Sequence, residues 1–377
     1  MLNILSFVFL GLLIFYFLFI RKIRVGITKL GYFGTQLQDN EFVSVIIPFR
    51  NESEKILESL KSLESQNYPS DKFEVIYIDD FSTDDSFEKL KNGITKENIF
   101  VYSMKDTNFA KAHKKQAIEF GISKSKGTII LFTDADCTNF PNWISTMVIG
   151  FEENTALISG PVAFAESDNL FGKLQSLEFA GLILSGAGLI GNKTPMIASS
   201  ANLAFRKSVF DEVGGYKNLM NLSSGDDELL MQKIAYSTNY DVKFCFEKDA
   251  LVKTDANKSL EEFNQQRKRW ASKGLFYENK LIVAQLFLIF LFYLGLIAQL
   301  FLGFFLDPRF LTIFSVSFML KILVEYAVME KGVGVLIEKI NLPLFLLAEI
   351  LHIPYIVYSA ISGALGNFTW KDRELKR

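Results

Sequence analysis

Two aspartates separated by one residue, Asp134 and Asp136, have a spacing that could bind a metal ion. They follow the apolar, β-branched run Thr128–Phe132, which predicts a buried strand. In open α/β sheets, ligands bind at the carboxyl ends of the strands. Two carboxylates facing a cleft at that edge suit a divalent cation, Mg²⁺ or Mn²⁺, that bridges diphosphate oxygens. Such pairs also occur by chance on surfaces, so the position after a strand carries this prediction of a metal site.

A second pair of carboxylates, Asp79 and Asp80, follows the apolar run Phe73–Ile78. The same rule places this pair at the ligand-binding edge of the sheet. The alternative is a structural turn in which Thr83 or Asp84 caps the following helix.

The amino-acid composition excludes several kinds of catalytic and binding site. The chain has 377 residues, with only two cysteines and two histidines. Two cysteines without a CxxC pair form neither a disulfide framework nor a zinc site, and two histidines leave little material for a Ser-His-Asp triad. The 40 basic and 42 acidic residues give a net charge of −2, which argues against nucleic-acid binding. Carboxylates must therefore carry any catalysis.

Short apolar runs alternate with helical stretches between Phe42 and about Lys280, and these elements must position the carboxylates. The alternation is typical of βαβ units and predicts an α/β domain over residues 42–280, with a mostly parallel sheet flanked by helices. The expected strands are Val43–Pro48, Phe73–Ile78, Ile99–Tyr102 and Thr128–Phe132, and the expected helices are Ser53–Ser65, Asp84–Asn92 and Lys111–Ser123.

Long apolar segments flank this domain in a chain that is 49% hydrophobic. Leu2–Ile20 and Leu281–Phe305 are each long enough to cross a bilayer as a helix, and we expect the first transmembrane helix over residues 1–22. A signal peptide is the alternative for the first segment, but no basic region precedes it. The positive-inside rule places the next segment in the cytoplasm because four basic residues follow directly. They are Arg21, Lys22, Arg24 and Lys29.

Two further apolar blocks complete a carboxy-terminal membrane region over residues 281–365. Phe310–Met329 contains Lys321 and Glu325, an i,i+4 pair that can neutralise itself on one helix face. Leu342–Leu365 precedes a basic tail, residues 366–377, which favours the cytoplasm. Four full spans that start with the amino terminus outside would put that tail outside. The last block is therefore either a span or a re-entrant or interfacial segment, and we expect the second.

The run Val43–Ser53, the Asp79–Asp84 turn and Asp134-Ala135-Asp136 occur in the order and spacing of family 2 glycosyltransferases. The sequence resembles that family over roughly residues 42–270, which implies the GT-A fold. Lys114–Ile122 also resembles a family segment, although His113 stands where Gly is common. The resemblance implies a nucleotide-sugar donor and several donor-binding residues. These are Pro48, Arg50, Glu52, Asp79, Asp80, Lys114 and Asp134.

Downstream, Gly225–Leu229 resembles the acidic catalytic motif of the family. By that match Asp227 is the base that accepts the proton of the acceptor hydroxyl, with Asp226 beside it. The alternative is a helix amino terminus that carries acids because they favour the positive end of the helix dipole. The stretch over residues 199–206 resembles the acceptor-side strand of the family, which implies that Asn202 and Arg206 bind the acceptor.

Gln266, Arg269 and Trp270 match the Gln-x-x-Arg-Trp motif of cellulose, chitin and hyaluronan synthases and of ceramide glucosyltransferases. Arg269 can neutralise a departing diphosphate, and Trp270 can form an apolar wall beside the acceptor. The alternative is a basic juxtamembrane stripe that contacts anionic lipid. The apolar stretch Leu170–Gly191 predicts either an interfacial helix that holds a lipid acceptor or a buried core helix.

Together these features predict an inverting, metal-assisted glycosyltransferase. It moves a sugar from a nucleotide-sugar donor to a hydroxyl of a lipid or lipid-linked glycan, on the cytoplasmic face of a bacterial inner membrane. One alternative is a processive polysaccharide synthase. A nucleotidyl or phosphoryl transferase on the same kind of sheet is another, and a membrane scaffold with a degenerate transferase fold is the non-enzymatic alternative.

Overall fold

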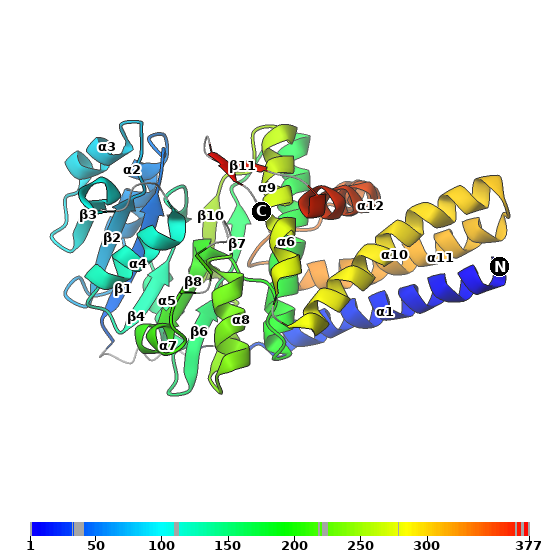
Figure 1. The fold of residues 1–377 in the computed structure, drawn as a ribbon, viewed down its shortest axis with the longest axis horizontal. Helices are drawn as coiled ribbons and strands as arrows, with labels where there is room; N and C mark the ends of the chain where they lie inside the picture. The colour runs from blue at the N-terminus through cyan, green and yellow to red at the C-terminus, as the bar shows by residue number, and fades with distance from the viewer. Residues whose placement is uncertain are drawn as a thin grey trace.

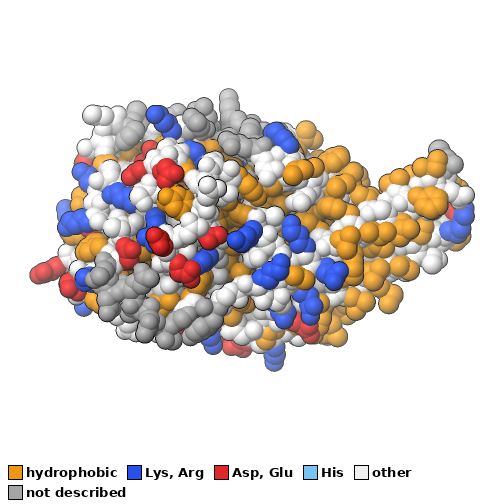
Figure 2. Space-filling model, turned by 90° about the horizontal axis from the view of Figure 1, so that it is seen from below, with side chains coloured by type: hydrophobic (Ala, Val, Ile, Leu, Met, Phe, Trp, Pro, Cys, Tyr) orange, Lys and Arg blue, Asp and Glu red, His pale blue; other side chains and the backbone are white. Residues whose placement is uncertain are grey.

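The computed structural model describes residues 2–31, 33, 41–108, 113–217, 219–220, 225–277 and 279–365, together with the backbone of 368–370 and 373–375. These residues form an α/β domain joined to a long helical arm (Figure 1). Figure 2 shows apolar side chains covering the arm, while Lys and Arg side chains gather where it joins the domain.

A seven-stranded sheet forms the core of the domain, in the order β3-β2-β1-β4-β8-β6-β9. Strands β1 to β4 are mutually parallel, β6 and β9 are parallel to each other, and β8 is antiparallel to both its neighbours. This confirms the predicted mostly parallel sheet. Its strands are β1 (Val43–Phe49), β2 (Phe73–Asp79), β3 (Ile99–Ser103), β4 (Ile129–Phe132), β6 (Thr155–Ser159), β8 (Leu203–Arg206) and β9 (Asp241–Phe244).

A second sheet of three short strands, in the order β5-β10-β7, lies beside the first. Its strands are β5 (Thr138–Asn139), β7 (Val162–Phe164) and β10 (Val252–Thr254). The helices of the domain flank the sheets because each buries an apolar face against them. They are α2 (Ile56–Glu64), α3 (Ser86–Gly93), α4 (Lys114–Lys124), α5 (Trp143–Ile149), α7 (Lys207–Glu212), α8 (Glu228–Ser237) and α9 (Leu260–Ser272).

Five helices among the described residues are long and apolar enough to cross a membrane. They are α1 (Leu2–Thr28), α6 (Leu170–Gly191), α10 (Lys280–Phe305), α11 (Arg309–Met329 with one further turn) and α12 (Leu342–Leu365). Helices α1, α10 and α11 run side by side and form the arm (Figure 1). The four apolar segments expected from the sequence are therefore all helical.

Helix α6 joins the arm to the domain. It packs along the domain end of α1, where a Cβ on Gly26 would lie 1.8 Å from the carbonyl oxygen of Gly188 and one on Gly191 would lie 2.1 Å from the carbonyl oxygen of Gly26. Only glycine permits this approach. In the most apolar part of α6, 61% is buried inside the structure, so α6 is largely a core helix.

Helix α12 lies across the base of the arm (Figure 1). Near its start, the Phe345 ring lies 5.5 Å from that of Tyr326 in α11. Near its end, a Cβ on Gly363 would lie 2.6 Å from the Cβ of Ala271 in α9. Both ends of α12 therefore contact elements at the domain end of the arm.

A buried cluster of charges holds α11 to α12. The Lys321 ammonium lies 3.0 Å from a Glu325 carboxylate oxygen, as their i,i+4 spacing predicts, and also pairs with Glu349 of α12. Lys321 is fully buried. Buried ions within apolar helices require such partners, since an unpaired charge there is costly.

Candidate active site

One cavity of about 1470 Å³ opens at the carboxyl ends of β1, β2 and β4. The loops after β1 and β2 each contain a non-glycine residue in the left-handed region, Asn51 (φ 51°) and Phe81 (φ 62°). The Asn51 side chain holds the two loops together, because its oxygen accepts a hydrogen bond of 2.8 Å from the Thr83 backbone. Such backbone strain tends to concentrate at functional sites.

Pro48, Arg50, Glu52 and Asp80 line this end of the cavity. Arg50 donates to the Asp80 carbonyl at 3.1 Å, and the Asp80 carboxylate accepts the His113 backbone N–H at 2.8 Å. Four of the expected donor-binding residues therefore face the same space.

Asp79 does not belong to this group. It is almost completely buried at the end of β2 and is absent from the cavity wall. Its carboxylate accepts hydrogen bonds from the Ser82 backbone at 2.8 Å and the Ser103 hydroxyl at 3.0 Å. The structure therefore does not bring Asp79 to the cavity, and its side chain fixes the turn that follows β2.

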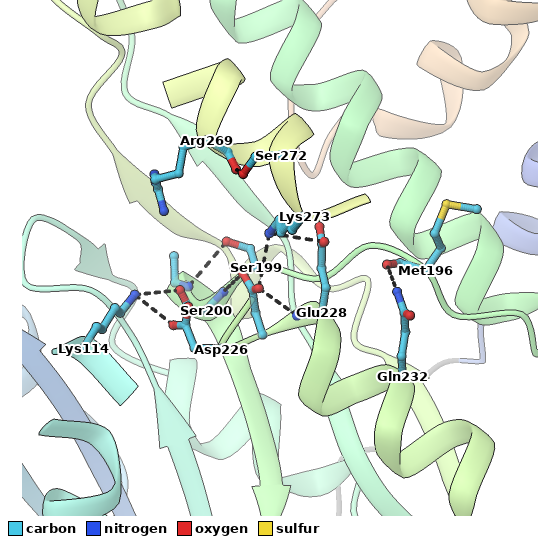
Figure 3. Close-up of polar contacts among 12 residues, drawn as sticks. Lys114, Met196, Ser199, Ser200, Asp226, Glu228, Gln232, Arg269, Ser272 and Lys273 are labelled. Atoms are coloured by element: carbon cyan, nitrogen blue, oxygen red, sulfur yellow. Dashed lines mark hydrogen bonds and ion pairs between the residues drawn. The ribbon is translucent and has the colours of Figure 1, made fainter. Parts of the chain in front are cut away.

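Lys114, at the first turn of α4, connects three segments of the site (Figure 3). Its ammonium lies 3.0 Å from Asp134, 3.1 Å from Asp226 and 3.0 Å from the Ser200 hydroxyl. Burial opposes the charge on Lys114, but Asp134 and Asp226 outweigh it and hold its pKa above the ordinary value. Burial likewise opposes ionisation of Asp226, yet Lys114 and Lys115 hold the pKa of that carboxyl below its usual range. Both groups are therefore charged at neutral pH.

Asp227 caps the amino terminus of α8. One oxygen accepts the Glu228 N–H at 2.7 Å, and the other accepts the Ser200 N–H at 3.1 Å. The Lys273 ammonium lies 3.5 Å from Asp227 and 3.2 Å from Glu228, and the Tyr277 hydroxyl donates to Glu228 at 2.6 Å. Asp227 is thus a helix cap, as the alternative drawn from the sequence predicted, and it also lines the cavity, where its role as the base stays a prediction.

The residues present fit a divalent cation. Asp134 and Asp136 both line the cavity in the turn after β4, and Mg²⁺ or Mn²⁺ sites commonly combine one or two carboxylates with water and substrate phosphates. Among the described residues, no group of three or more His, Cys, Asp or Glu side chains is placed to hold a metal alone. Oxygen ligands from a diphosphate would have to complete the coordination.

Helix α9 places Gln266, Arg269 and Trp270 on the opposite wall. Figure 3 shows Arg269 across from the cluster that contains Lys114 and Asp226. Burial lowers the pKa of Arg269, while the carboxylates of Asp226, Asp227 and Asp134 oppose that shift by favouring the charged guanidinium. This position suits stabilisation of a departing diphosphate.

Asn202 and Arg206 are not brought to the cavity. Asn202 is fully buried, where it accepts from the Trp143 indole at 3.0 Å and donates to the Ala250 carbonyl at 2.7 Å. Arg206 lies at the far end of β8 and donates to the carbonyls of Thr155 and Glu152, both at 3.0 Å. The strand was placed correctly by its resemblance, but these two side chains brace the fold instead of facing the acceptor.

Two cations at the site were missed from the sequence. Lys273 follows α9 and reaches Asp227, and Arg267 pairs with Glu178 of α6 while stacking 4.3 Å from the Trp270 ring centroid. Arg267 was visible inside the Gln-x-x-Arg-Trp motif at a variable position. Lys273 carries no motif signal, and only the path of the chain after α9 reveals it.

Comparisons with known proteins find glycosyltransferases that are similar to this chain. Residues 44–214 match the family model described as Glycosyl transferase family 2. The chain is 29% identical over 187 residues to glycosyltransferase AglE of Haloferax volcanii, covering 49% of this chain and 59% of that protein. It is 26% identical over 248 residues to a poly-β-1,6-N-acetyl-D-glucosamine synthase of Staphylococcus epidermidis, covering 63% of this chain and 55% of that protein. The chain thus spans little more than half the length of these relatives.

Among solved structures, the chain resembles the mannosyltransferase PcManGT of Pyrobaculum calidifontis, which was determined in complex with GDP-Man and Mn²⁺. The TM-score is 0.59 at 15% identity, and the superposition covers 97% of this chain and 99% of that one. This likeness supports the GT-A fold for the α/β domain.

Proposed function

We propose that this chain, a family 2 glycosyltransferase with the GT-A fold, transfers a sugar from a nucleotide-sugar donor to a hydroxyl of a lipid or lipid-linked acceptor with inversion. The observation that carries the proposal is the single cavity onto which three sets of residues converge. These are the strand-end carboxylates Asp80, Asp134 and Asp136, the helix cap Asp227, and Gln266, Arg269 and Trp270 of α9.

The sugar donor binds at the strand-end side of the cavity in this proposal. Asp80 contacts the base and ribose, and Asp136 with Asp134 holds Mg²⁺ or Mn²⁺. When bound, the cation neutralises charge on the diphosphate leaving group. Lys114 lies between Asp134 and Asp226 and holds both carboxylates in place through its two ion pairs.

Asp227 receives the proton of the attacking hydroxyl. Its cap geometry fixes the carboxylate against α8, while Lys273 approaches the same carboxylate oxygen and balances its charge. Arg269 faces the same acids from α9 and stabilises the negative charge that develops on the leaving diphosphate. Trp270 forms the apolar wall beside the acceptor. A positioned base typically contributes about 10²–10⁴ in rate.

A membrane location for the catalytic domain follows from the arm. Exposed Arg21, Arg24 and Lys29 stand at the domain end of α1, so we place this end in the cytoplasm of a bacterial cell. We also propose that α12 lies at the membrane interface, because both its ends contact the domain end of the arm. Only α1, α10 and α11 then cross the membrane, so the basic tail stays in the cytoplasm, as its charge predicts.

Processive polymer synthesis is the second candidate, favoured by the similarity to the poly-β-1,6-N-acetyl-D-glucosamine synthase. A donor screen with purified protein in membranes, followed by mass spectrometry of the lipid and aqueous phases, tests both. Single transfer predicts a lipid product heavier by one sugar. A ladder of products would favour the synthase, and the absence of both transfer and donor hydrolysis with every nucleotide sugar would refute the proposed function.

A further inference from the structure

The cavity does not end at Trp270. Beyond α9 it continues as an apolar corridor between α6, α10 and α12, formed by side chains that no step of the sugar transfer uses. The corridor is lined by Phe179, Leu182 and Ile183 of α6, by Val283, Ala284, Leu286, Phe287 and Phe290 of α10, and by Ile356, Ala360 and Ala364 of α12. The polar reaction site and an apolar channel are therefore one continuous space.

The corridor reaches exposed apolar side chains of α10 and α12 on the outside of the molecule. Phe287 of α10 and Leu365 of α12 both line it, and their side chains are 57% and 83% exposed. Both helices are among those apolar enough to lie in a membrane. If these two helices lie in a membrane, an apolar molecule would meet this end of the cavity from the lipid side.

The volume supports a second occupant beside the sugar donor. Pockets for a single small ligand usually enclose roughly 300–1,000 Å³, whereas this cavity encloses about 1470 Å³. A nucleotide sugar bound at Asp80, Asp134 and Asp136 leaves the corridor unfilled.

A polar clamp marks the boundary between the two regions. Arg267 of α9 donates to Glu178 of α6 at 3.1 Å, and Tyr355 of α12 donates to the same carboxylate at 2.9 Å. Arg267 is almost fully buried and stacks on Trp270. The clamp ties α6, α9 and α12 together where the corridor meets the reaction site, so the head group of an apolar acceptor would rest against Trp270.

The charges that line the cavity indicate which head group the acceptor can carry. Nine carboxylates and seven basic side chains line the described cavity, and Asp226, Asp227 and Glu228 stand at the reacting end. The diphosphate of the donor and a divalent cation cancel each other's charge to a first approximation. The three carboxylates at the reacting end pair with Lys114 and Lys273, and Arg269 is assigned to the leaving diphosphate, so an anionic acceptor would lack a counter-ion at this end whereas a neutral hydroxyl needs none.

We propose that the acceptor is a membrane lipid with an uncharged, hydroxyl-bearing head group, and that its chain reaches the site laterally between α10 and α12. This inference rests on the proposed glycosyltransferase function. It identifies the acceptor class and the path that the acceptor takes.

Two obstructing substitutions test the path, Ala284→Trp on α10 and Ala360→Trp on α12. The control is Leu294→Trp, at an exposed position of α10 outside the cavity. With the sugar donor found in the screen, lipid extract in phosphatidylcholine vesicles serves as acceptor, and hydrolysis of the donor by water is measured in parallel. Filling the corridor should lower lipid glycosylation by about tenfold or more. Donor hydrolysis should stay close to the wild-type rate, and the control should match wild type in both.

The head group is tested with two lipids that carry the same chains, dioleoylglycerol and dioleoyl phosphatidate, added as competitors. The neutral lipid should suppress transfer to the extract at a mole fraction about tenfold lower than the phosphate lipid. Equal competition would overturn the neutral head group, and unchanged lipid glycosylation in both obstructed variants would overturn the lateral path. Absence of both lipid glycosylation and donor hydrolysis in the wild-type protein would instead refute the proposed function.

Discussion

The substitution Asp227→Asn separates the proposed base from the fold that holds it. Two backbone donors, the N–H groups of Glu228 and Ser200, each bind a different oxygen of the Asp227 carboxylate. Asparagine caps helices as well as aspartate does, but its single oxygen can serve only one of them. The unsatisfied N–H should cost about 1–3 kcal/mol. Domains of this size lose roughly 2–4 °C in Tm per kcal/mol, so we expect a folded protein with a modestly lower Tm.

The expected kinetic effect is much larger than the effect on stability. Loss of a positioned general base lowers transfer by about 10²–10⁴. Affinity for the nucleoside diphosphate with metal should stay within a few fold, because Asp227 lies on α8 and the donor contacts are assigned to the strand ends. Single-turnover transfer, isothermal titration of the nucleotide and thermal melting in detergent give the three quantities.

Asp211→Asn is the matched control, since it makes the same chemical change at an exposed position of α7. It should leave all three quantities unchanged. If Asp227→Asn abolishes nucleotide binding while transfer per bound donor is preserved, Asp227 belongs to the donor site. The base must then be sought at Asp226, whose carboxylate is already held by Lys114.

Three further predictions follow from the site and its surroundings. Activity should require Mg²⁺ or Mn²⁺ and be lost in Asp136→Asn, because an amide cannot supply the charge that a hard cation requires, and full turnover in EDTA would contradict this. Burial lowers the pKa of Lys115 to about 8, so between that pH and the ordinary pKa of lysine the unfolded chain binds more protons than the folded chain. The free energy of unfolding should therefore rise with pH in this window in wild type, and it should rise less in Lys115→Met. Equal slopes in the two proteins would exclude Lys115 as the source. A cysteine at Glu58, or at Lys376 beyond the described residues, should react with an impermeant thiol reagent only after cells are opened, and labelling of Glu58→Cys in intact cells would reverse the orientation.

Strands β1 to β4 were predicted to within one residue at each end, because buried strands require continuous apolar residues, whereas β6 and β9 were not predicted. All positions of β1 and β2 are buried. The same continuous apolar pattern did not show which of the two adjacent acids at the end of β2 faces the cavity. Asp79 is still part of β2 and bonds inward, whereas Asp80 is the first residue beyond the strand and turns to the cavity.

Contacts between segments that lie far apart in the sequence could not be predicted. Lys273 meets Asp227 across 46 residues, and Arg267 meets Glu178 across 89. The corridor requires α12 to pack on α9 through Gly363, a contact that neither helix signals by its own pattern. Resemblance to a family likewise located the strand that contains Asn202 and Arg206, but only the burial of its side chains shows which way they point.

The anomeric configuration of the product tests the central claim most directly. A single displacement, in which Asp227 takes the proton as the acceptor hydroxyl attacks, inverts the anomeric carbon. With an α-linked nucleotide sugar as donor, the purified product should therefore carry a β-linked sugar, as read from its one-bond carbon–proton coupling by NMR. A product that keeps the α configuration would contradict a single displacement and the role given to Asp227.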